Sequence, residues 1–266
     1  MTDSGTYLRY VALGDSQTEG VGDGDGDDAT GLRGFADRLA ERLAAVNPEV
    51  RYANLAVRGR LAADVHAEQL APALALKPDL VTVVAGVNDL MRPSFDAAAV
   101  AGHLEAMYAQ LAQAGATVVG VTFPDVGRLV PLARPLARRV VDLNSRIRAA
   151  AHRHGVVLAD TADVAVVTDP RLWCADRLHA SPLGHDRIAA ALADALNLPG
   201  SDDSWTRPLP PPDTPVPAGL RMVAAEARWV GTFLGPWLGR RLRGRSSGDG
   251  RAAKRPELTP VRPAEA

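Results

Sequence analysis

The sequence predicts an α/β fold in which a five-stranded parallel sheet lies between two layers of helices. In the first 200 residues, short β-branched or apolar runs alternate with Ala/Leu-rich stretches of helical spacing, which is typical of a parallel sheet covered by helices. The strand-like runs are apolar almost throughout, as expected for strands buried on both faces. With 47% apolar and 23% charged residues, the chain has the composition of a globular protein with a sizeable core.

The individual elements follow from these runs. We expect strands over Tyr7–Leu13, Val50–Asn54, Leu80–Ala85, Thr117–Thr122 and Val156–Asp160. We expect helices over Gly34–Val46, Leu61–Leu74, Phe95–Ala114, Leu132–His154 and Leu183–Leu196. Stop signals support these boundaries, because Asn47-Pro48 follows the first helix and Gly115 and Gly155 follow the third and fourth.

The composition changes after Pro199, which divides the chain into a core domain (1–200), a proline-rich linker (201–219) and a C-terminal segment (220–266). Residues 218–234 predict an amphipathic helix, interrupted or kinked at Gly235-Pro236, with Trp229, Phe233 and Trp237 on one stripe. We expect this helix to dock on the core domain, because so much apolar surface is unlikely to stay in water. We expect the basic low-complexity tail from residue 240 to 266 to be mostly mobile, so that truncation after Gly239 leaves stability and activity nearly unchanged.

Charge and cysteine content narrow the classes of function. With a net charge of −1, the protein as a whole does not attract nucleic acid electrostatically, and no nucleic-acid partner is expected. The one cysteine, Cys174, excludes an intramolecular disulfide. The N-terminal residues lack the pattern of a secretory signal, and no run of 18 apolar residues occurs, so a cytoplasmic location is expected. The basic tail leaves weak contact with an anionic membrane open as an alternative.

The first candidate functional residue is Ser16, at the exit of the first strand. Ligands of open parallel sheets bind outside the carboxyl ends of the strands, and the first strand runs into Gly14–Gly20 (GDSQTEG). A serine in a glycine-bounded turn at this edge is exposed and held by the backbone, as a nucleophile requires. A plain helix cap at Asp15-Ser16 is the competing interpretation.

Gly59 and Asn88 are candidate donors that follow the second and third strands. A backbone N–H at a glycine and a side-chain amide can stabilise the oxyanion of a tetrahedral intermediate if they are held in place. A tight turn at Gly59 and an Asx turn at Asn88 are the structural alternatives. Their placement favours the functional interpretation, because both loops belong to the edge of the sheet that holds Ser16.

Asp176 and His179 lie after the fifth strand, before a helix that Ser181 can cap and Pro182 can start. A carboxylate three residues ahead of a histidine can bind its Nδ1 and leave Nε2 to take the Ser16 proton. A metal site formed by Asp176, His179 and His185 is the rival interpretation, but it lacks further ligands at matching spacing.

The acidic run 23–28 raises a separate question of calcium binding. It departs from the EF-hand pattern at the sixth and twelfth positions, so we interpret it as a solvated loop. With the rival metal site set aside as well, the sequence predicts a protein with no metal and no cofactor.

Together these motifs resemble the four blocks of the SGNH (GDSL-type) hydrolase superfamily. The blocks are Gly14-Asp15-Ser16, Asn54…Gly59, Gly86–Asp89 and Asp176-x-x-His179, in the family's order and approximate separation over residues 7 to 198. The resemblance implies a flavodoxin-like three-layer α/β/α sandwich. It also implies that Ser16 is the nucleophile and first oxyanion donor, Gly59 and Asn88 the other donors, and His179 the base, with Asp176 as its partner.

The chain departs from the family pattern at Ala56, where members usually have glycine, which puts the local loop shape in doubt. The Arg/Gly-rich stretch 236–245 is similar to the ending of actinobacterial members with a basic C-terminal tail.

The expected function is that of a metal-independent serine esterase or lipase-type hydrolase, which cleaves a small-molecule carboxylic ester or thioester through an acyl-enzyme on Ser16. The candidate lining of an acyl pocket consists of apolar residues that follow strand ends, with plain packing as the alternative role, namely Leu90, Met91, Phe123, Val126, Leu129 and Trp173. Two alternatives stay open: a binding protein that keeps the fold without turnover, and a protein directed to a membrane or nucleic acid by its tail. The sequence does not indicate the oligomeric state.

Overall fold

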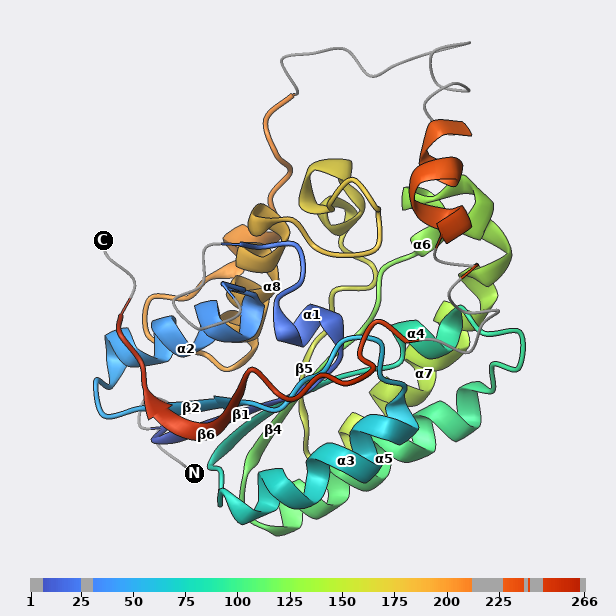
Figure 1. The fold of residues 1–266 in the computed structure, drawn as a ribbon. Helices are drawn as coiled ribbons and strands as arrows, with labels where there is room; N and C mark the ends of the chain where they lie inside the picture. Colours follow the sequence, from blue (N-terminus) through green and yellow to red (C-terminus); the bar gives the residue numbers. More distant parts are fainter. Residues whose placement is uncertain (1–6, 25–30, 212–226, 237–238, 240–245, 264–266) are drawn as a thin grey trace.

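The computed structural model describes residues 7–24, 31–211, 227–236, 239 and 246–263. Its centre is a six-stranded sheet in the order β5-β4-β3-β1-β2-β6 (Figure 1). The strands are β1 (Arg9–Gly14), β2 (Arg51–Asn54), β3 (Leu80–Val84), β4 (Thr117–Val121), β5 (Val157–Ala159) and β6 (Arg255–Pro260). The five expected strands are confirmed and run parallel, whereas the expected strand count is wrong, because β6 adds an antiparallel strand beside β2.

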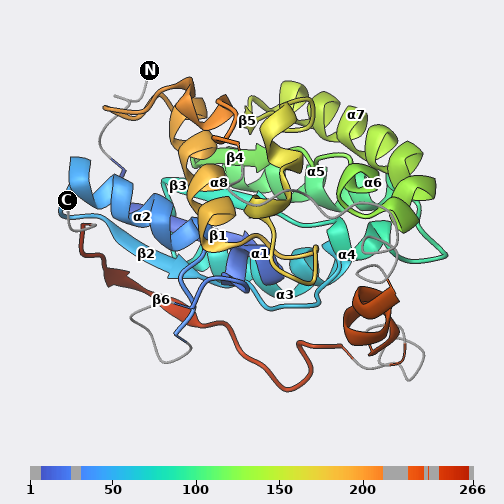
Figure 2. The same cartoon turned by 90° about the horizontal axis from the view of Figure 1, so that it is seen from above.

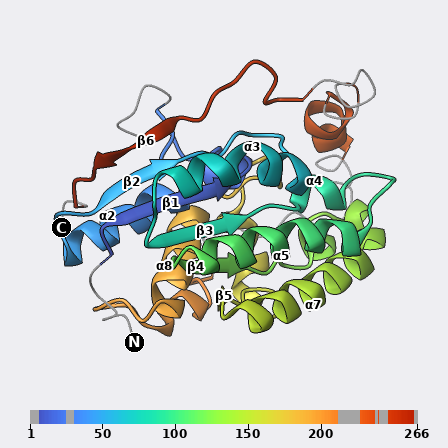
Figure 3. The ribbon, with the colours of Figure 1, turned by 90° about the horizontal axis from the view of Figure 1, so that it is seen from below.

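Helices cover both faces of the sheet, which confirms the three-layer α/β/α prediction. α2 (Phe35–Val46) and α8 (Pro182–Ala195) pack on one face. α3 (Ala62–Ala75), α5 (Ala97–Gln113) and α7 (Ala137–His154) pack side by side on the other, as the view from below shows (Figure 3). The core lies in the two interfaces between sheet and helices, and every residue of β3 is buried, which explains its continuous apolar sequence.

The helix expected over Leu132–His154 is split in two. Residues Pro131–Leu136 form a 3₁₀ helix (η1), and the α-helix begins only at Ala137. Pro135 supplies the physical reason, because proline lacks the N–H of a helix interior and its ring crowds the preceding turn. At the other end, Gly155 adopts a left-handed conformation (φ 63°) that ends α7 as the sequence predicts.

Short elements follow the carboxyl ends of the strands and form the upper side of the molecule (Figure 2). They are α1 (Ser16–Glu19), α4 (Val87–Leu90), α6 (Val126–Leu129), η2 (Ala165–Thr168) and η3 (Pro170–Leu172), whereas the short η4 (Asp203–Thr206) follows α8. Every candidate catalytic residue predicted from the sequence lies on or beside these elements. In the described part of the chain, no helix is long and apolar enough to cross a membrane.

The C-terminal tail is not mobile throughout, which corrects the prediction for residues 246–263. β6 pairs with β2, with Thr259 opposite Tyr52 and Arg255 opposite Asn54. Just before β6, Lys254 donates from Nζ to an Asp37 carboxylate oxygen on α2 (2.7 Å). The tail therefore closes an edge of β2 whose N–H and C=O groups would otherwise be unpaired. The basic run 240–245 lies outside the described residues.

The C-terminal helix is present over residues 227–236, and its docking on the core is confirmed there. It continues through Gly235 and Pro236, so the helix is not interrupted there, and of the two expected effects only a local distortion is found. Val230–Leu234 instead form a wider π turn, closed by a bond from the Gly235 N–H to the Val230 carbonyl, which makes room for the proline. Trp229 is buried while Ala227 is exposed, so the docked side is the tryptophan side. Residues 218–226 and Trp237 of the predicted helix lie outside the described residues.

Candidate active site

Ser16 is the first residue of α1, directly above the end of β1. Gly14 is required at the strand end, because a Cβ there would collide with the Val84 carbonyl oxygen and the Thr18 hydroxyl. The Gln69 side chain brackets Gly14 by accepting from its N–H and donating to its carbonyl, both at 2.9 Å. These contacts fix the position at which the chain leaves the sheet, and with it the position of the Ser16 hydroxyl.

Ser16, His179 and Asp176 form one chain of hydrogen bonds. His179 Nε2 lies 3.0 Å from Ser16 Oγ, and His179 Nδ1 lies 2.6 Å from Asp176 Oδ2. Burial alone would raise the pKa of Asp176. The hydrogen bond from His179 and those from the Leu178 and His179 amides outweigh it and hold this pKa below its ordinary value. Asp176 is therefore ionised at neutral pH and can orient the imidazole.

Gln17, the neighbour of Ser16, ties α1 to the loop that carries His179. Its Nε2 donates to the Leu178 carbonyl (2.8 Å), and its Oε1 accepts from the Ala180 N–H (3.2 Å). Both bonds are made to residues adjacent to His179, one on each side. The distance between the serine and the histidine is thus set by a side chain that sequence reasoning passed over.

Asn88 lies in α4 and donates from Nδ2 to the Asp15 carboxylate (3.0 Å) and to the Arg60 carbonyl (3.1 Å). Asp15 also accepts from the Gln17 N–H (3.2 Å), so the helix-cap interpretation of Asp15 is correct and coexists with a second role. Asp15 is almost completely buried, and burial raises its pKa to about 6. Sequence reasoning missed the Asp15–Asn88 bond, since it joins loops that are far apart in the chain.

Gly59 lies in the loop between β2 and α3 with a φ of 78°, a conformation that glycine adopts freely. The preceding residue, Arg58, donates its backbone N–H to Glu19 (2.7 Å) and forms an ion pair with the same carboxylate (2.7 Å). At Ala56, the departure from the family pattern, the N–H donates to Asn54 Oδ1 (3.0 Å) and closes a regular Asx turn. The loop shape therefore tolerates alanine at this position.

The tail reaches this same loop. Ser246 Oγ lies 3.4 Å from the Gly59 carbonyl oxygen. Gly248 packs so closely on the Arg58 carbonyl that no Cβ fits there. Residues 246–248, which we call the clasp, thus hold the outer side of the Gly59 loop. The sequence gives no signal for this contact, because it joins a low-complexity segment to a loop near the start of the chain.

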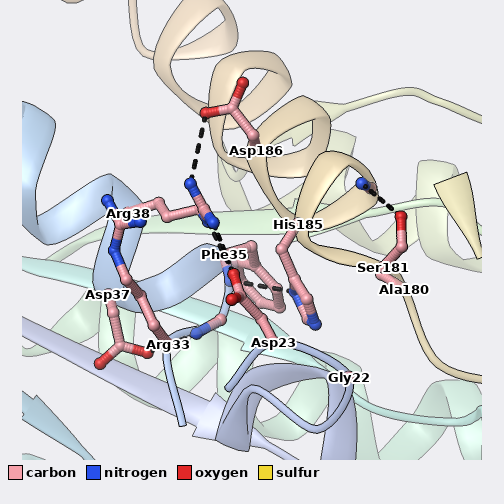
Figure 4. A network of polar contacts seen from close by, with 12 residues as sticks. Gly22, Asp23, Arg33, Phe35, Asp37, Arg38, Ala180, Ser181, His185 and Asp186 are labelled. Atoms are coloured by element: carbon pink, nitrogen blue, oxygen red, sulfur yellow. Dashed lines mark hydrogen bonds and ion pairs between the residues drawn. The ribbon is translucent and has the colours of Figure 1, made fainter. Parts of the chain in front are cut away.

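His185 does not join Asp176 and His179, although the rival interpretation groups the three. It is buried in α8 and stacks on Phe35, whose N–H donates to Nδ1 (3.1 Å) (Figure 4). Its Nε2 lies 3.2 Å from the Val21 carbonyl oxygen. Burial lowers its pKa to about 4, so it is neutral at neutral pH. With both ring nitrogens engaged by backbone groups, His185 is a structural histidine.

Asp23, the first residue of the acidic run, is also occupied. It forms a buried ion pair with Arg38 (2.6 Å) (Figure 4), while residues 25–28 of the run lie outside the described residues. Among the residues that the structure describes, no group of three or more His, Cys, Asp or Glu side chains is placed to hold a metal ion.

An apolar cavity of about 310 Å³ borders Asp176 and His179. Of the residues predicted to line an acyl pocket, Leu90, Met91 and Val126 line this cavity. Phe123, Leu129 and Trp173 line a second cavity of about 100 Å³, which shares part of its wall with the first. The structure adds Trp229 and Phe233 of the C-terminal helix to the larger cavity.

The comparisons with known proteins agree with this geometry. Residues 12–187 match the model of the GDSL-like lipase/acylhydrolase family, whereas a search of the curated proteins finds no match. Among solved structures, the chain is similar to a catalytic variant of an acetylxylan esterase from Geobacillus stearothermophilus (21% identity over 75% of this chain and 96% of that one, TM-score 0.61). It is also similar to the lipase/acylhydrolase from Enterococcus faecalis (23% identity over 71% of this chain and 96% of that one, TM-score 0.57).

A third similar structure is an alpha/beta hydrolase enzyme from the metagenome of Lake Arreo, Spain (24% identity over 71% of this chain and 95% of that one, TM-score 0.60). At these identities the likeness to solved structures shows the fold. The family match extends over more than half of the chain and includes all the motif residues from Gly14 to His179. The chain therefore belongs to the GDSL-like lipase/acylhydrolase family, has the SGNH hydrolase fold, and is a carboxylic ester hydrolase.

Proposed function

We propose that this protein is a metal-independent serine hydrolase that cleaves carboxylic esters through an acyl-enzyme on Ser16. The observation that carries the proposal is the chain of hydrogen bonds from Ser16 Oγ through the His179 imidazole to the Asp176 carboxylate. A serine hydroxyl is a weak nucleophile by itself and needs an adjacent base that is oriented by a third group. These three side chains meet that requirement at the edge of the sheet where ligands bind.

In the first half of the proposed reaction, Ser16 Oγ bonds to the acyl carbon while His179 Nε2 takes the hydroxyl proton. The carbonyl π electrons move onto oxygen, and their return expels the alcohol, which takes the proton from His179. In the second half, water attacks the acyl-enzyme and gives a proton to His179. The bond to Oγ then breaks, and Ser16 regains its proton as the acid leaves.

The oxyanion of both tetrahedral intermediates is bound in this proposal by the Ser16 and Gly59 backbone N–H groups and the Asn88 amide. Asn88 Nδ2 donates to Asp15 and, at the longer distance of 3.1 Å, to the Arg60 carbonyl. We assign the hydrogen that faces Arg60 to the oxyanion, because the buried Asp15 carboxylate is the stronger acceptor. Asp15 then holds the amide in place while that second hydrogen changes partner.

Variants of a structural neighbour support the same residue roles. Catalytic variants of the acetylxylan esterase from Geobacillus stearothermophilus replace a serine, an aspartate and a histidine, and the last two are three residues apart. Asp176 and His179 have the same spacing here.

The likeness of the Arg/Gly-rich ending to actinobacterial members stays a prediction, since residues 240–245 lie outside the described part of the chain.

The Ser16→Ala variant tests the proposal. It should lose turnover of p-nitrophenyl acetate and labelling by a fluorophosphonate probe, because no nucleophile remains at the end of the hydrogen-bond chain. Circular dichroism and melting temperature should stay at the wild-type values. The wild type should keep its activity after exhaustive EDTA treatment, and a thioester panel would show whether thioesters are also cleaved.

Two results would contradict the proposal. Wild-type labelling in Ser16→Ala would place the nucleophile elsewhere. A folded wild type that neither reacts with the probe nor turns over any ester would favour a binding protein that keeps the fold without catalysis.

A further inference from the structure

The C-terminal helix forms part of the apolar cavity beside the candidate catalytic residues. One side of the cavity comes from α4, η1 and α6, and another from the loop that carries Asp176 and His179. Trp229 and Phe233 supply the remaining aromatic wall, and they lie beyond residues 12–187, which match the family. The wall is therefore a feature of this chain that the matched family region does not provide.

Trp229 is fixed to the catalytic loop. Its indole Nε1 donates to the Asp176 carbonyl (3.2 Å), and the Arg177 guanidinium lies 5.1 Å from its ring centre. Trp229 is 9% exposed, so its ring is held between the loop and the cavity. A hydrogen bond and a cation–π contact to consecutive loop residues leave the indole little freedom to turn away.

The wall continues into the interior. The two cavities share Val87, Leu90, Val126, Arg177 and Leu178, and the smaller one extends from these residues toward Val121 and Phe123 at the end of β4. A chain of carbon atoms that enters past Trp229 therefore meets apolar side chains along its length. Ser16 itself lines neither cavity, so a longer chain on the ester has more of this surface to contact than an acetyl group has.

We propose that Trp229 and Phe233 determine specificity, by forming the wall that selects esters with an unbranched apolar chain of medium length. This inference rests on the proposed hydrolysis at Ser16. Each methylene that the wall removes from water raises kcat/KM by about fourfold. The cavity of about 310 Å³ is at the small end of the range of about 300–1,000 Å³ for ligand pockets, which limits the chain to a medium length.

The test measures kcat/KM for p-nitrophenyl acetate, butyrate, hexanoate and octanoate, together with butyl and hexyl acetate. The wild type should prefer hexanoate to acetate by at least about tenfold. Trp229→Ala and Phe233→Ala should each lower this ratio by about tenfold or more, because the longer chain loses its wall. The ratio compares two substrates within one variant, so a uniform loss of activity from a shifted loop does not affect it.

Three further variants separate the wall from other effects. Trp229→Phe removes the hydrogen bond to Asp176 but keeps an aromatic wall, and should keep the ratio within about threefold of the wild type. Ala133→Phe fills the cavity from η1 and should favour acetate, even if the tryptophan variants fail to fold. Leu8→Ala, a half-exposed residue outside the cavity, should leave the ratio unchanged.

The outcomes distinguish this inference from the proposed function. If Ser16→Ala is inactive but the ratio is the same in the wild type, Trp229→Ala and Ala133→Phe, the wall does not select the chain and the inference is wrong. If the wild type turns over no ester at all, the proposed function has failed instead. A preference for hexanoate alone places the chain on the acyl side, and a preference for hexyl acetate places it on the alcohol side.

Discussion

Asp15 connects the two residues to which the proposed mechanism assigns the nucleophile and an oxyanion donor. Its carboxylate accepts from the first turn of α1, which carries Ser16, and from the Asn88 side chain in α4. A buried carboxylate with two donors has few other positions available, so it fixes both helices at once. The position of Asn88 is therefore set before any substrate binds.

Asn88→Ala should lower kcat by about 10²–10³ and change KM little, because the lost donor acts on the transition state. Steady-state kinetics on p-nitrophenyl acetate measures this. Asn47→Ala is the matched control, since Asn47 also bonds a backbone carbonyl, that of Tyr7, but lies at the opposite end of the sheet. It should change stability and not kcat. An Asn88→Ala enzyme with wild-type kcat would make Asn88 a structural residue.

His185 should make stability depend on pH. Burial lowers its pKa to about 4 in the folded protein, against about 6.5 in the unfolded chain. Between these values the unfolded chain binds a proton that the folded one does not. The contribution of the neutral His185 to the free energy of unfolding is therefore complete above pH 6.5 and is lost as the pH falls toward 4. Relative to His185→Gln, the wild type should lose about 3 kcal/mol of unfolding free energy from pH 7 to pH 4.

Urea unfolding of both proteins across this pH range provides the measurement. Asp15, whose pKa is also perturbed, titrates in both proteins and cancels in the difference. The exposed His152, changed to Gln, is the control for loss of an imidazole and should leave the unfolding free energy at pH 7 at the wild-type value. A constant difference between wild type and His185→Gln would mean that His185 is protonated within the fold.

At this scale the sequence identified the residues that the proposed mechanism uses, because each follows a strand whose apolar pattern is plain. Ser16, Asn88 and His179 therefore come to one edge of the sheet by topology alone. The sequence could not show which side chains hold them. Asp15 and Gln17 were within the motif, but their partners lie in loops whose conformation only the folded chain defines.

Among the elements, β6 has the least expected role. It covers the open edge of β2 and is tied to α2 by Lys254, whose side chain is 1% exposed and bonds both Asp37 and the Leu32 carbonyl. Burial raises the pKa of Asp37, and Lys254 opposes that effect with its charge. The ion pair is thus a buried link between the tail and the core.

Lys254→Met should destabilise the protein by about 3–5 kcal/mol, because it removes the cation that is bonded to the buried Asp37 carboxylate. Urea unfolding monitored by fluorescence measures the loss. Adding Asp37→Asn should recover part of it, since asparagine can still accept from the Gly34 N–H. The chain's other lysine, Lys77, is exposed and serves as control through Lys77→Met. Equal stability of both methionine variants would show that the buried pair contributes nothing.

The elements that sequence patterns failed to predict share a cause. β6 (RPELTP) contains two prolines and two charged residues and has no apolar alternation, so nothing local identifies it as a strand. It is a strand because β2 offers an unpaired edge. The helix across Gly235-Pro236 likewise persists because Trp229 is bonded to the Asp176 carbonyl, a tertiary contact that local propensity does not include.

For the molecule as a whole, the described parts of the C-terminal segment pack on the core domain beside the candidate active site. Truncation after Gly239 removes β6, Lys254 and the clasp on the Gly59 loop, and should lower the melting temperature by about 10 °C and reduce kcat. This replaces the expectation from sequence that such a truncation is silent. Truncation after Pro199 also removes Trp229 and should lower stability further.

A chain ending at Pro263 keeps all of β6 and is the control for both truncations. It should match the full chain in melting temperature, measured by differential scanning calorimetry, and in kcat. If the chain truncated after Gly239 also has the melting temperature and kcat of the full chain, the contacts of the tail contribute to neither stability nor activity.

The register of β6 places the start of β1 and the end of β6 on either side of the same residue of β2. Arg9 of β1 and Pro260 of β6 are both paired with Arg51 of β2, so the chain enters and leaves the sheet about 10 Å apart. A short linker could join these two points, so the chain is suited to circular permutation. For the same reason, the entire domain could be inserted into a surface loop of a host protein. Tension from such a host would peel β6 from the edge first, and the clasp on the Gly59 loop would release while the central strands stay paired.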